Sequence, residues 1–135
     1  MNFSEVKVHQ LHAVWDFVRR GLLAIIEKTG DDWLPEDIYS ELRAGASALF
    51  LIDVGDEQVG FVVLQVWPQY HSGPRLFVRA LWCEPGALVE HQEAVEQKLR
   101  ELALKCGARA VRMNSPRRWD RAGWKLKQSI FEMEV

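Results

Sequence analysis

Residues Val59–Trp67 read VGFVVLQVW, and after a short interval Arg75–Cys83 reads RLFVRALWC. Both runs are rich in β-branched and aromatic residues, and the interval contains Pro68, Gly73 and Pro74, so the pattern predicts two strands joined by a loop. Strict alternation along the second strand places four residues on each face: Leu76, Val78, Ala80 and Trp82 on one, and Phe77, Arg79, Leu81 and Cys83 on the other.

A long helix is predicted directly after the second strand. Pro85-Gly86-Ala87 interrupts the strand, and apolar residues then recur at helical spacing as far as about Cys106, with Gly107 as the expected stop. The residues expected to face inward are Leu88, Val95, Leu99, Leu102, Ala103 and Cys106.

Before this region the sequence predicts a strand at Phe3–Val8 and two helices. The first helix begins near Leu11 and ends at Lys28-Thr29-Gly30, and the second runs from Pro35 to about Gly45, because glycine commonly follows a helix and proline commonly opens one. Residues Ala48–Val54 form a nearly continuous apolar run, which is typical of a strand covered on both faces.

After the long helix we expect a strand at Ala108–Met113, a turn-rich basic segment at Ser115–Trp124, and a closing strand. In that closing strand Phe131, Met133 and Val135 alternate with Glu132 and Glu134. The chain has 135 residues, 48% of them apolar and 27% charged, so it is predicted to fold as one globular domain over residues 1–135.

The composition also excludes several classes of protein. No apolar run approaches about 18 residues, and the first residues do not form a signal peptide, so we expect neither a membrane span nor secretion. Cys83 and Cys106 give no disulfide framework. His9 and His12 lie one helical turn apart, but no third ligand is indicated, so no metal site is predicted.

The net charge of −2 is unevenly distributed. Residues 1–104 carry 9 Lys and Arg against 16 Asp and Glu, whereas residues 105–135 carry 8 against 3. The basic segment, with Trp119 and Trp124, could contact an anionic ligand or form a solvated face. An isoelectric point near 6.1 argues against nucleic acid as the partner.

The order of predicted elements, β-α-α-β-β-β-α-β-(α)-β, resembles the GCN5-related N-acetyltransferase (GNAT) superfamily over essentially the whole chain. The local resemblances are the two strands before the long helix, the Gly107–Arg112 junction, and Arg121-Ala122-Gly123-Trp124-Lys125. The resemblance implies an α/β (α+β) fold with a mixed, mostly antiparallel central sheet and helices on both faces. The short length is similar to that of compact GNAT-like proteins of phages and prophages.

The resemblance also implies a site for acetyl-CoA. GNAT enzymes bind the coenzyme A pyrophosphate with a Q/R-x-x-G-x-G/A loop, whose backbone N–H groups face the phosphates. With Gly86 as the first glycine, Cys83 and Leu88 replace the usual residues, so the loop is degenerate, and Pro85 lacks an N–H donor. The cofactor-binding residues that the resemblance implies are Leu81, Trp82, Cys83, Gly86, Ala87, Leu88, Arg117 and Arg118.

For catalysis the resemblance implies a group that accepts the amine proton and usually a tyrosine that protonates the leaving thiolate. Glu84 and His71 are the candidate catalytic residues. Tyr39 and Tyr70 are the only tyrosines, and neither falls in the expected late segment.

Two functions follow as hypotheses. One is an acyl-CoA-dependent N-acyltransferase that moves an acetyl group to an amine acceptor of unknown identity. The other is a non-catalytic GNAT-like interaction or virion-associated protein of phage or prophage type, with a protein partner. A cytoplasmic location is expected, or a virion-associated one for a phage-derived chain, and a homo-oligomer stays open.

Overall fold

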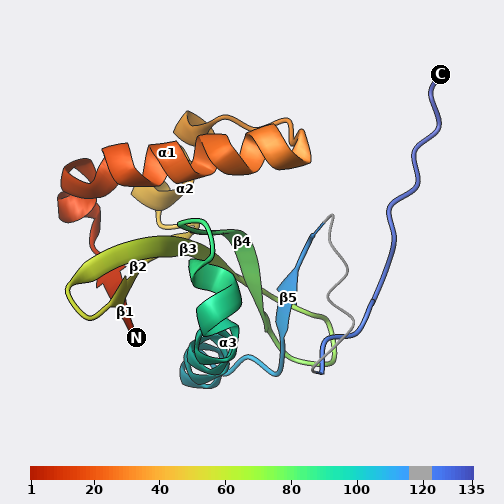
Figure 1. Ribbon diagram of the computed structural model, residues 1–135. Helices are drawn as coiled ribbons and strands as arrows, with labels where there is room; N and C mark the ends of the chain where they lie inside the picture. Colours follow the sequence, from red (N-terminus) through yellow and green to blue (C-terminus); the bar gives the residue numbers. More distant parts are fainter. Residues whose placement is uncertain (116–122) are drawn as a thin grey trace.

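The computed structural model describes residues 1–115 and 123–135. Its strands form one five-stranded sheet in the order β1-β2-β3-β4-β5 (Figure 1). The strands are β1 (Asn2–Val6), β2 (Ala48–Val54), β3 (Glu57–Trp67), β4 (Arg75–Cys83) and β5 (Val111–Met113). Neighbours from β1 to β4 are antiparallel, and β5 pairs parallel with β4. This arrangement confirms the predicted mixed, mostly antiparallel sheet.

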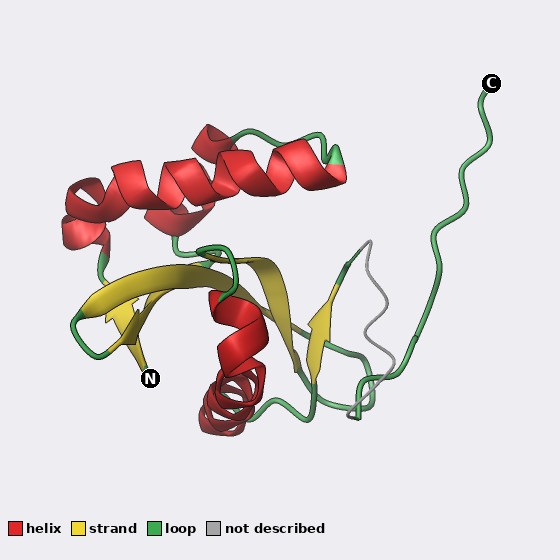
Figure 2. Ribbon diagram, in the orientation of Figure 1, coloured by secondary structure: helices red, strands yellow, loops and turns green. Residues whose placement is uncertain are grey.

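Helices cover both faces of the sheet (Figure 2). A short 3-10 turn, Val8–Gln10, leads into α1 (Leu11–Thr29), and α2 (Pro35–Ala44) follows. These helices pack on one face with Leu49, Phe61 and Val63 of the sheet. The helix α3 (Ala87–Lys105) packs on the other face with Val62, Leu64 and Val78. The run Ala48–Val54 is therefore covered on both sides, as its continuous apolar sequence predicted.

The helix boundaries follow the predicted capping signals. Gly30 and Gly45 end α1 and α2 in the left-handed conformation, with φ of 70° and 78°, which glycine adopts without steric cost. Pro35 is the first residue of α2, and the backbone N–H of Leu34 donates to Asp37 Oδ2 at 2.8 Å. No helix among the described residues is long and apolar enough to cross a lipid bilayer.

A β-bulge in β4 contradicts the predicted alternation of that strand. Val63 lies opposite Ala80 and Leu64 lies opposite Val78, so Arg79 is an extra residue on the β4 side. The sequence predicted that Leu76, Val78, Ala80 and Trp82 share one face of the sheet. Leu76 and Val78 do pack on the same side, toward α3, but Ala80 and Trp82 pack toward α1. The extra residue resets the alternation, and for that reason the single predicted face is wrong beyond Val78.

The C-terminal part of the chain differs most from prediction. The strand β5 has three residues instead of the six expected at Ala108–Met113, and residues 124–135 contain no strand. They run away from the body of the protein as an extended chain (Figures 1 and 2). A strand exists only through hydrogen bonds to a neighbour, and the alternating sequence defines two faces without supplying that neighbour.

Cys106 corrects a smaller prediction. We expected it to face inward from the long helix, but it is exposed at the C-cap of α3, and its Sγ contacts the carbonyl oxygen of Ala103 at 3.4 Å. The helical repeat ends at Lys105, so the inward spacing no longer applies at the next residue.

Gly21 tests the close packing of α1 on the sheet. A Cβ at this position would meet the Phe61 ring and would lie 2.8 Å from Trp82 Cδ2. We expect Gly21→Ala to lower the free energy of unfolding by about 1–3 kcal/mol through overpacking. The loss is the net effect: alanine favours the helix over glycine by about 1 kcal/mol, and the steric clash costs more than this gain.

Urea unfolding monitored by circular dichroism measures this change. Gly30→Ala is the control, because its Cβ would meet nothing within 4 Å, and only its positive φ should cost stability. A Gly21→Ala protein as stable as the wild type would contradict the packing of α1 described here.

Candidate functional site

The central feature of the site is the point at which β4 and β5 separate. The two strands pair only from Leu76 opposite Val111 to Val78 opposite Met113. Beyond this point β4 continues to Cys83, and no described strand pairs with it on that side. The bulge at Arg79 begins immediately after the last pair, and bulges bend a strand and increase its twist. Figure 1 shows the two strands side by side at their lower ends and separating above.

The predicted cofactor-binding residues gather at the end of this separated segment. Leu81, Trp82 and Cys83 are the last residues of β4, Gly86 is the N-cap of α3, and Ala87 and Leu88 are the first residues of that helix. All six are therefore placed along one short path from the open part of β4 to the helix N-terminus.

The N-terminus of α3 carries backbone N–H groups that no side chain caps. Gly86 is the N-cap, with a φ of 84°, and it makes no side-chain cap hydrogen bond. The N–H of Ala87 donates to the Glu84 carbonyl at 3.0 Å, which leaves the first-turn N–H groups of Leu88 and Val89 without an intrahelical acceptor. Such open N–H groups favour an anionic ligand. The first turn of α3 is separated from the rest of the helix by a kink at His91, whose φ of −116° and ψ of 20° are not helical.

Glu84 lies beside this helix N-terminus, and its charge is already paired. Its Oε1 accepts a hydrogen bond from Arg20 Nη2 of α1 at 2.7 Å. The Arg20 guanidinium also lies over the rings of Phe17 and Trp82, at 5.5 and 5.3 Å from their centroids. The structure thus offsets the negative charge of Glu84 next to the open N–H groups. No sequence signal singled out Arg20, because the partner comes from a distant helix.

A second polar cluster surrounds the bulge residue. Glu41 of α2 accepts hydrogen bonds from Arg79 Nε at 3.3 Å and from Arg79 Nη2 at 3.2 Å. The same carboxylate accepts from Ser47 Oγ at 3.0 Å and from Gln65 Nε2 at 3.1 Å. The Arg79 guanidinium also lies 5.3 Å from the centroid of the Trp33 ring. The sequence analysis missed this cluster, since its five members come from five separate segments.

His71 is not brought to the same place as Glu84. It is exposed in the loop between β3 and β4, beside Tyr70, whereas Glu84 follows the opposite end of β4. A strand of this length separates its ends by on the order of 25 Å. Tyr39, the other tyrosine, packs edge-on against Trp15 with ring centroids 4.7 Å apart.

The remaining candidate residues are placed as follows. Arg117 and Arg118 lie outside the described residues.

Burial raises the pKa of the Cys83 thiol to about 11, so this thiol stays protonated at neutral pH and is a poor nucleophile. His9 and His12 are both exposed, and among the described residues no group of three or more metal-ligating side chains is placed to hold an ion.

The Glu41–Arg79 pair should stabilise the bulge. Both side chains are about three-quarters buried, so Arg79→Met removes two donors from a carboxylate that water reaches poorly. We expect a loss of about 1–3 kcal/mol in the free energy of unfolding. The double variant with Glu41→Gln should lose less than the sum of the two single changes, because the residues are coupled.

Chemical denaturation of the four proteins in this cycle measures the coupling. Arg43→Met is the matched control. Arg43 is exposed on α2, the helix that carries Glu41, and its replacement should change the free energy of unfolding by less than about 0.5 kcal/mol. If Arg79→Met costs no more than this control, the pair does not hold the bulge.

Comparisons with known proteins give matches in structure but not in sequence. No protein-family model and no curated protein matches the chain. A GCN5-related N-acetyltransferase from Ralstonia eutropha is 14% identical with a TM-score of 0.72, and the match covers 97% of this chain and 96% of that one. An integron cassette protein from the Cole Harbour Salt Marsh metagenome is 18% identical with a TM-score of 0.71, over 98% and 89% of the two chains.

A further solved structure contains the expected ligand. It is a predicted acetyltransferase from Clostridium acetobutylicum with acetyl-CoA, 11% identical with a TM-score of 0.69, and the match covers 98% of this chain and 95% of that one. Identities this low establish a shared architecture and leave the activity open. The separated strands, the bulge and the following helix thus belong to a chain that has the GCN5-related N-acetyltransferase fold.

Proposed function

We propose that the protein is an acyl-CoA-dependent N-acyltransferase that transfers an acetyl group from acetyl-CoA to an amine. The observation that carries the proposal is the separation of β4 from β5 at the Arg79 bulge, directly before a helix N-terminus with open N–H groups. The shared fold with acetyltransferases, one of them with acetyl-CoA, supports the same choice.

The residues at the site fit a coenzyme A pyrophosphate in part. The N–H groups of Leu88 and Val89 supply donors, and Arg20 supplies a cation that offsets Glu84. Pro85 supplies no donor, so the loop has fewer contacts for phosphate than the Q/R-x-x-G-x-G/A pattern. We expect binding that is weaker than a complete loop would give, with Arg117 and Arg118 as proposed further phosphate contacts.

The proposed reaction is direct transfer. A neutral amine attacks the thioester carbonyl, the new C–N bond forms, the C–S bond breaks, and the thiolate leaves with its electron pair. A backbone N–H at the bulge in β4 would polarise the carbonyl oxygen. Because a thiol has a pKa near 8.5, the thiolate is a tolerable leaving group without a tyrosine acid.

The proton of the amine needs an acceptor. Glu84 is the proposed acceptor through bridging water, because it lies five residues along the chain from the bulge, and Arg20 fixes the position of its carboxylate. His71 lies toward the other end of β4, so we propose it as a contact for the acceptor molecule and not for the thioester.

Val89→Glu tests the proposed pyrophosphate contact without disturbing the fold. Val89 is 81% exposed in the first turn of α3, so a change of its side chain should disturb little packing. The added carboxylate should repel the phosphates and weaken acetyl-CoA binding at least about tenfold, or about 1.4 kcal/mol. The loss should shrink as salt is raised.

Calorimetric titration with acetyl-CoA measures the dissociation constants, and Val89→Gln is the neutral control of similar shape. The wild type should bind with micromolar affinity, roughly −8 kcal/mol. Release of free thiol in an amine screen then identifies the acceptor. No binding of acetyl-CoA at millimolar concentration would refute the acyltransferase proposal and favour the non-catalytic interaction protein, of which a phage- or prophage-type module is one form.

A further inference from the structure

One edge of the Arg79 guanidinium stays open beside the bulge in β4. Glu41 occupies the edge formed by Nε and Nη2, through hydrogen bonds of 3.3 and 3.2 Å. The edge formed by Nη1 and Nη2 keeps further N–H donors that Glu41 does not use. No hydrogen bond joins Nη1 to another residue in the described part of the chain. Since no buried side-chain nitrogen or oxygen of the described residues lacks a partner, Nη1 is open to solvent.

The contacts around Arg79 hold this open edge in place. Ser47 and Gln65 also donate to the Glu41 carboxylate, at 3.0 and 3.1 Å, and the Arg79 guanidinium lies 5.3 Å from the centroid of the Trp33 ring. The guanidinium would lose its contacts to Glu41 and Trp33 if it turned the open edge inward. An edge of this kind binds a carboxylate through two parallel hydrogen bonds. Because its orientation is already fixed, binding costs little side-chain entropy.

The charge on this face of the sheet favours an anion. Arg112 lies opposite Phe77 in the pairing of β4 with β5, and Phe77 lies opposite Gln65 in the pairing of β3 with β4. Paired residues project to the same face of a sheet, so Arg112 shares the face on which Gln65 meets Glu41. Arg112 forms no ion pair with a described residue, and Glu41 therefore shares this face with two guanidinium groups.

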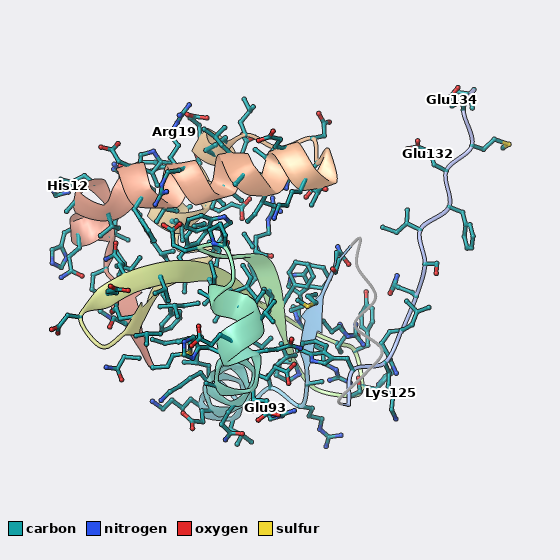
Figure 3. All side chains as sticks on the ribbon, in the orientation of Figure 1. His12, Arg19, Glu93, Lys125, Glu132 and Glu134 are labelled. Atoms are coloured by element: carbon teal, nitrogen blue, oxygen red, sulfur yellow. The ribbon has the colours of Figure 1, made fainter. Side chains whose placement is uncertain are left out.

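Other carboxylates contribute less at this point. Asp31 accepts a hydrogen bond from Trp33 Nε1 at 3.2 Å, but Asp31 is exposed, so solvent screens its charge. Figure 3 shows Glu93 on α3, the helix on the opposite face of the sheet, and it shows Glu132 and Glu134 far from the sheet. The surroundings of the open guanidinium edge therefore suit a ligand with a single negative charge, such as a carboxylate.

We propose that the acceptor carries a carboxylate close to its amine, as an α-amino acid does, and that Arg79 binds this carboxylate. The inference rests on the proposed acyltransferase function. The backbone N–H that would polarise the thioester carbonyl lies at the bulge that Arg79 itself forms. The amine and the carboxylate of an α-amino acid are bonded to the same carbon, so a carboxylate bound at Arg79 brings the amine toward the polarised carbonyl. Arg79 thereby selects the acceptor by charge and positions it.

A comparison of each amino acid with its primary amide tests the proposal. The common amino acids are offered as acceptors with acetyl-CoA, each beside its amide, and release of free thiol gives kcat/KM. The amide lacks the negative charge and has the less basic amine, so it should react faster where the carboxylate is not recognised. We expect at least one amino acid to exceed its amide about tenfold or more in kcat/KM.

Arg79→Lys separates carboxylate binding from the pairing with Glu41. Lysine can keep an ion pair with Glu41 but has no second edge for a carboxylate. The preference for the acid should fall at least about tenfold with little change in kcat/KM for the amide, whereas a structural defect would lower both values alike. Arg112→Gln should lower the preference by a smaller factor that shrinks as salt is raised. Arg43→Lys, on the exposed side of α2, is the control and should leave the preference unchanged.

The outcomes separate this inference from the function on which it rests. A chain that binds no acetyl-CoA in the calorimetric titration is no acyltransferase, and the acceptor proposal falls with that function. A chain that binds acetyl-CoA but accepts no amino acid, or accepts the amides as readily as the acids, overturns the acceptor proposal alone. A preference for acids that Arg79→Lys leaves unchanged would also overturn it, because the carboxylate would then bind elsewhere.

Discussion

Arg79 inserts one extra residue into β4, and the positions of the site residues follow from that insertion. Before the bulge, Leu76 and Val78 face α3, and after it Ala80 and Trp82 face α1. Pairing with β5 ends one residue before the bulge, so β4 is free to turn away from its neighbour. The open part of β4 and the start of α3 then lie along one path, and it is along this path that we propose acetyl-CoA to bind.

Two ion pairs connect the open part of β4 and the residue that follows it to α1 and α2, the helices on the face of the sheet opposite α3. Arg79 is held by Glu41 of α2 at the bulge, and Glu84 is held by Arg20 of α1 at the far end. Between them Gly21 lets α1 approach the rings of Phe61 and Trp82 closely. The helices α1 and α2 thereby fix both ends of the open segment, and the Arg20–Glu84 pair offsets the carboxylate charge next to the open N–H groups of α3.

Local patterns in the sequence were enough for most of the fold. Gly30, Pro35 and Gly45 marked the helix ends correctly, because capping depends on nearby residues, and β4 was predicted with its observed bounds. The bulge was missed because it depends on register with β3, which alternation along one strand does not contain. Arg20 and Glu41 were missed for a similar reason, since their partners lie on distant segments. The prediction of a closing strand was wrong because residues 131–135 have the alternating pattern but pair with no described strand.

The central claim is that the open part of β4 and the first turn of α3 form one acyl-CoA site. Amide chemical-shift mapping of the isotope-labelled protein during a titration with coenzyme A tests it most directly. We predict that the largest shifts fall at residues 79–83 and at Leu88 and Val89, with little change in β1. Shifts confined to other parts of the chain, or no saturable shift, would contradict this assignment of the site.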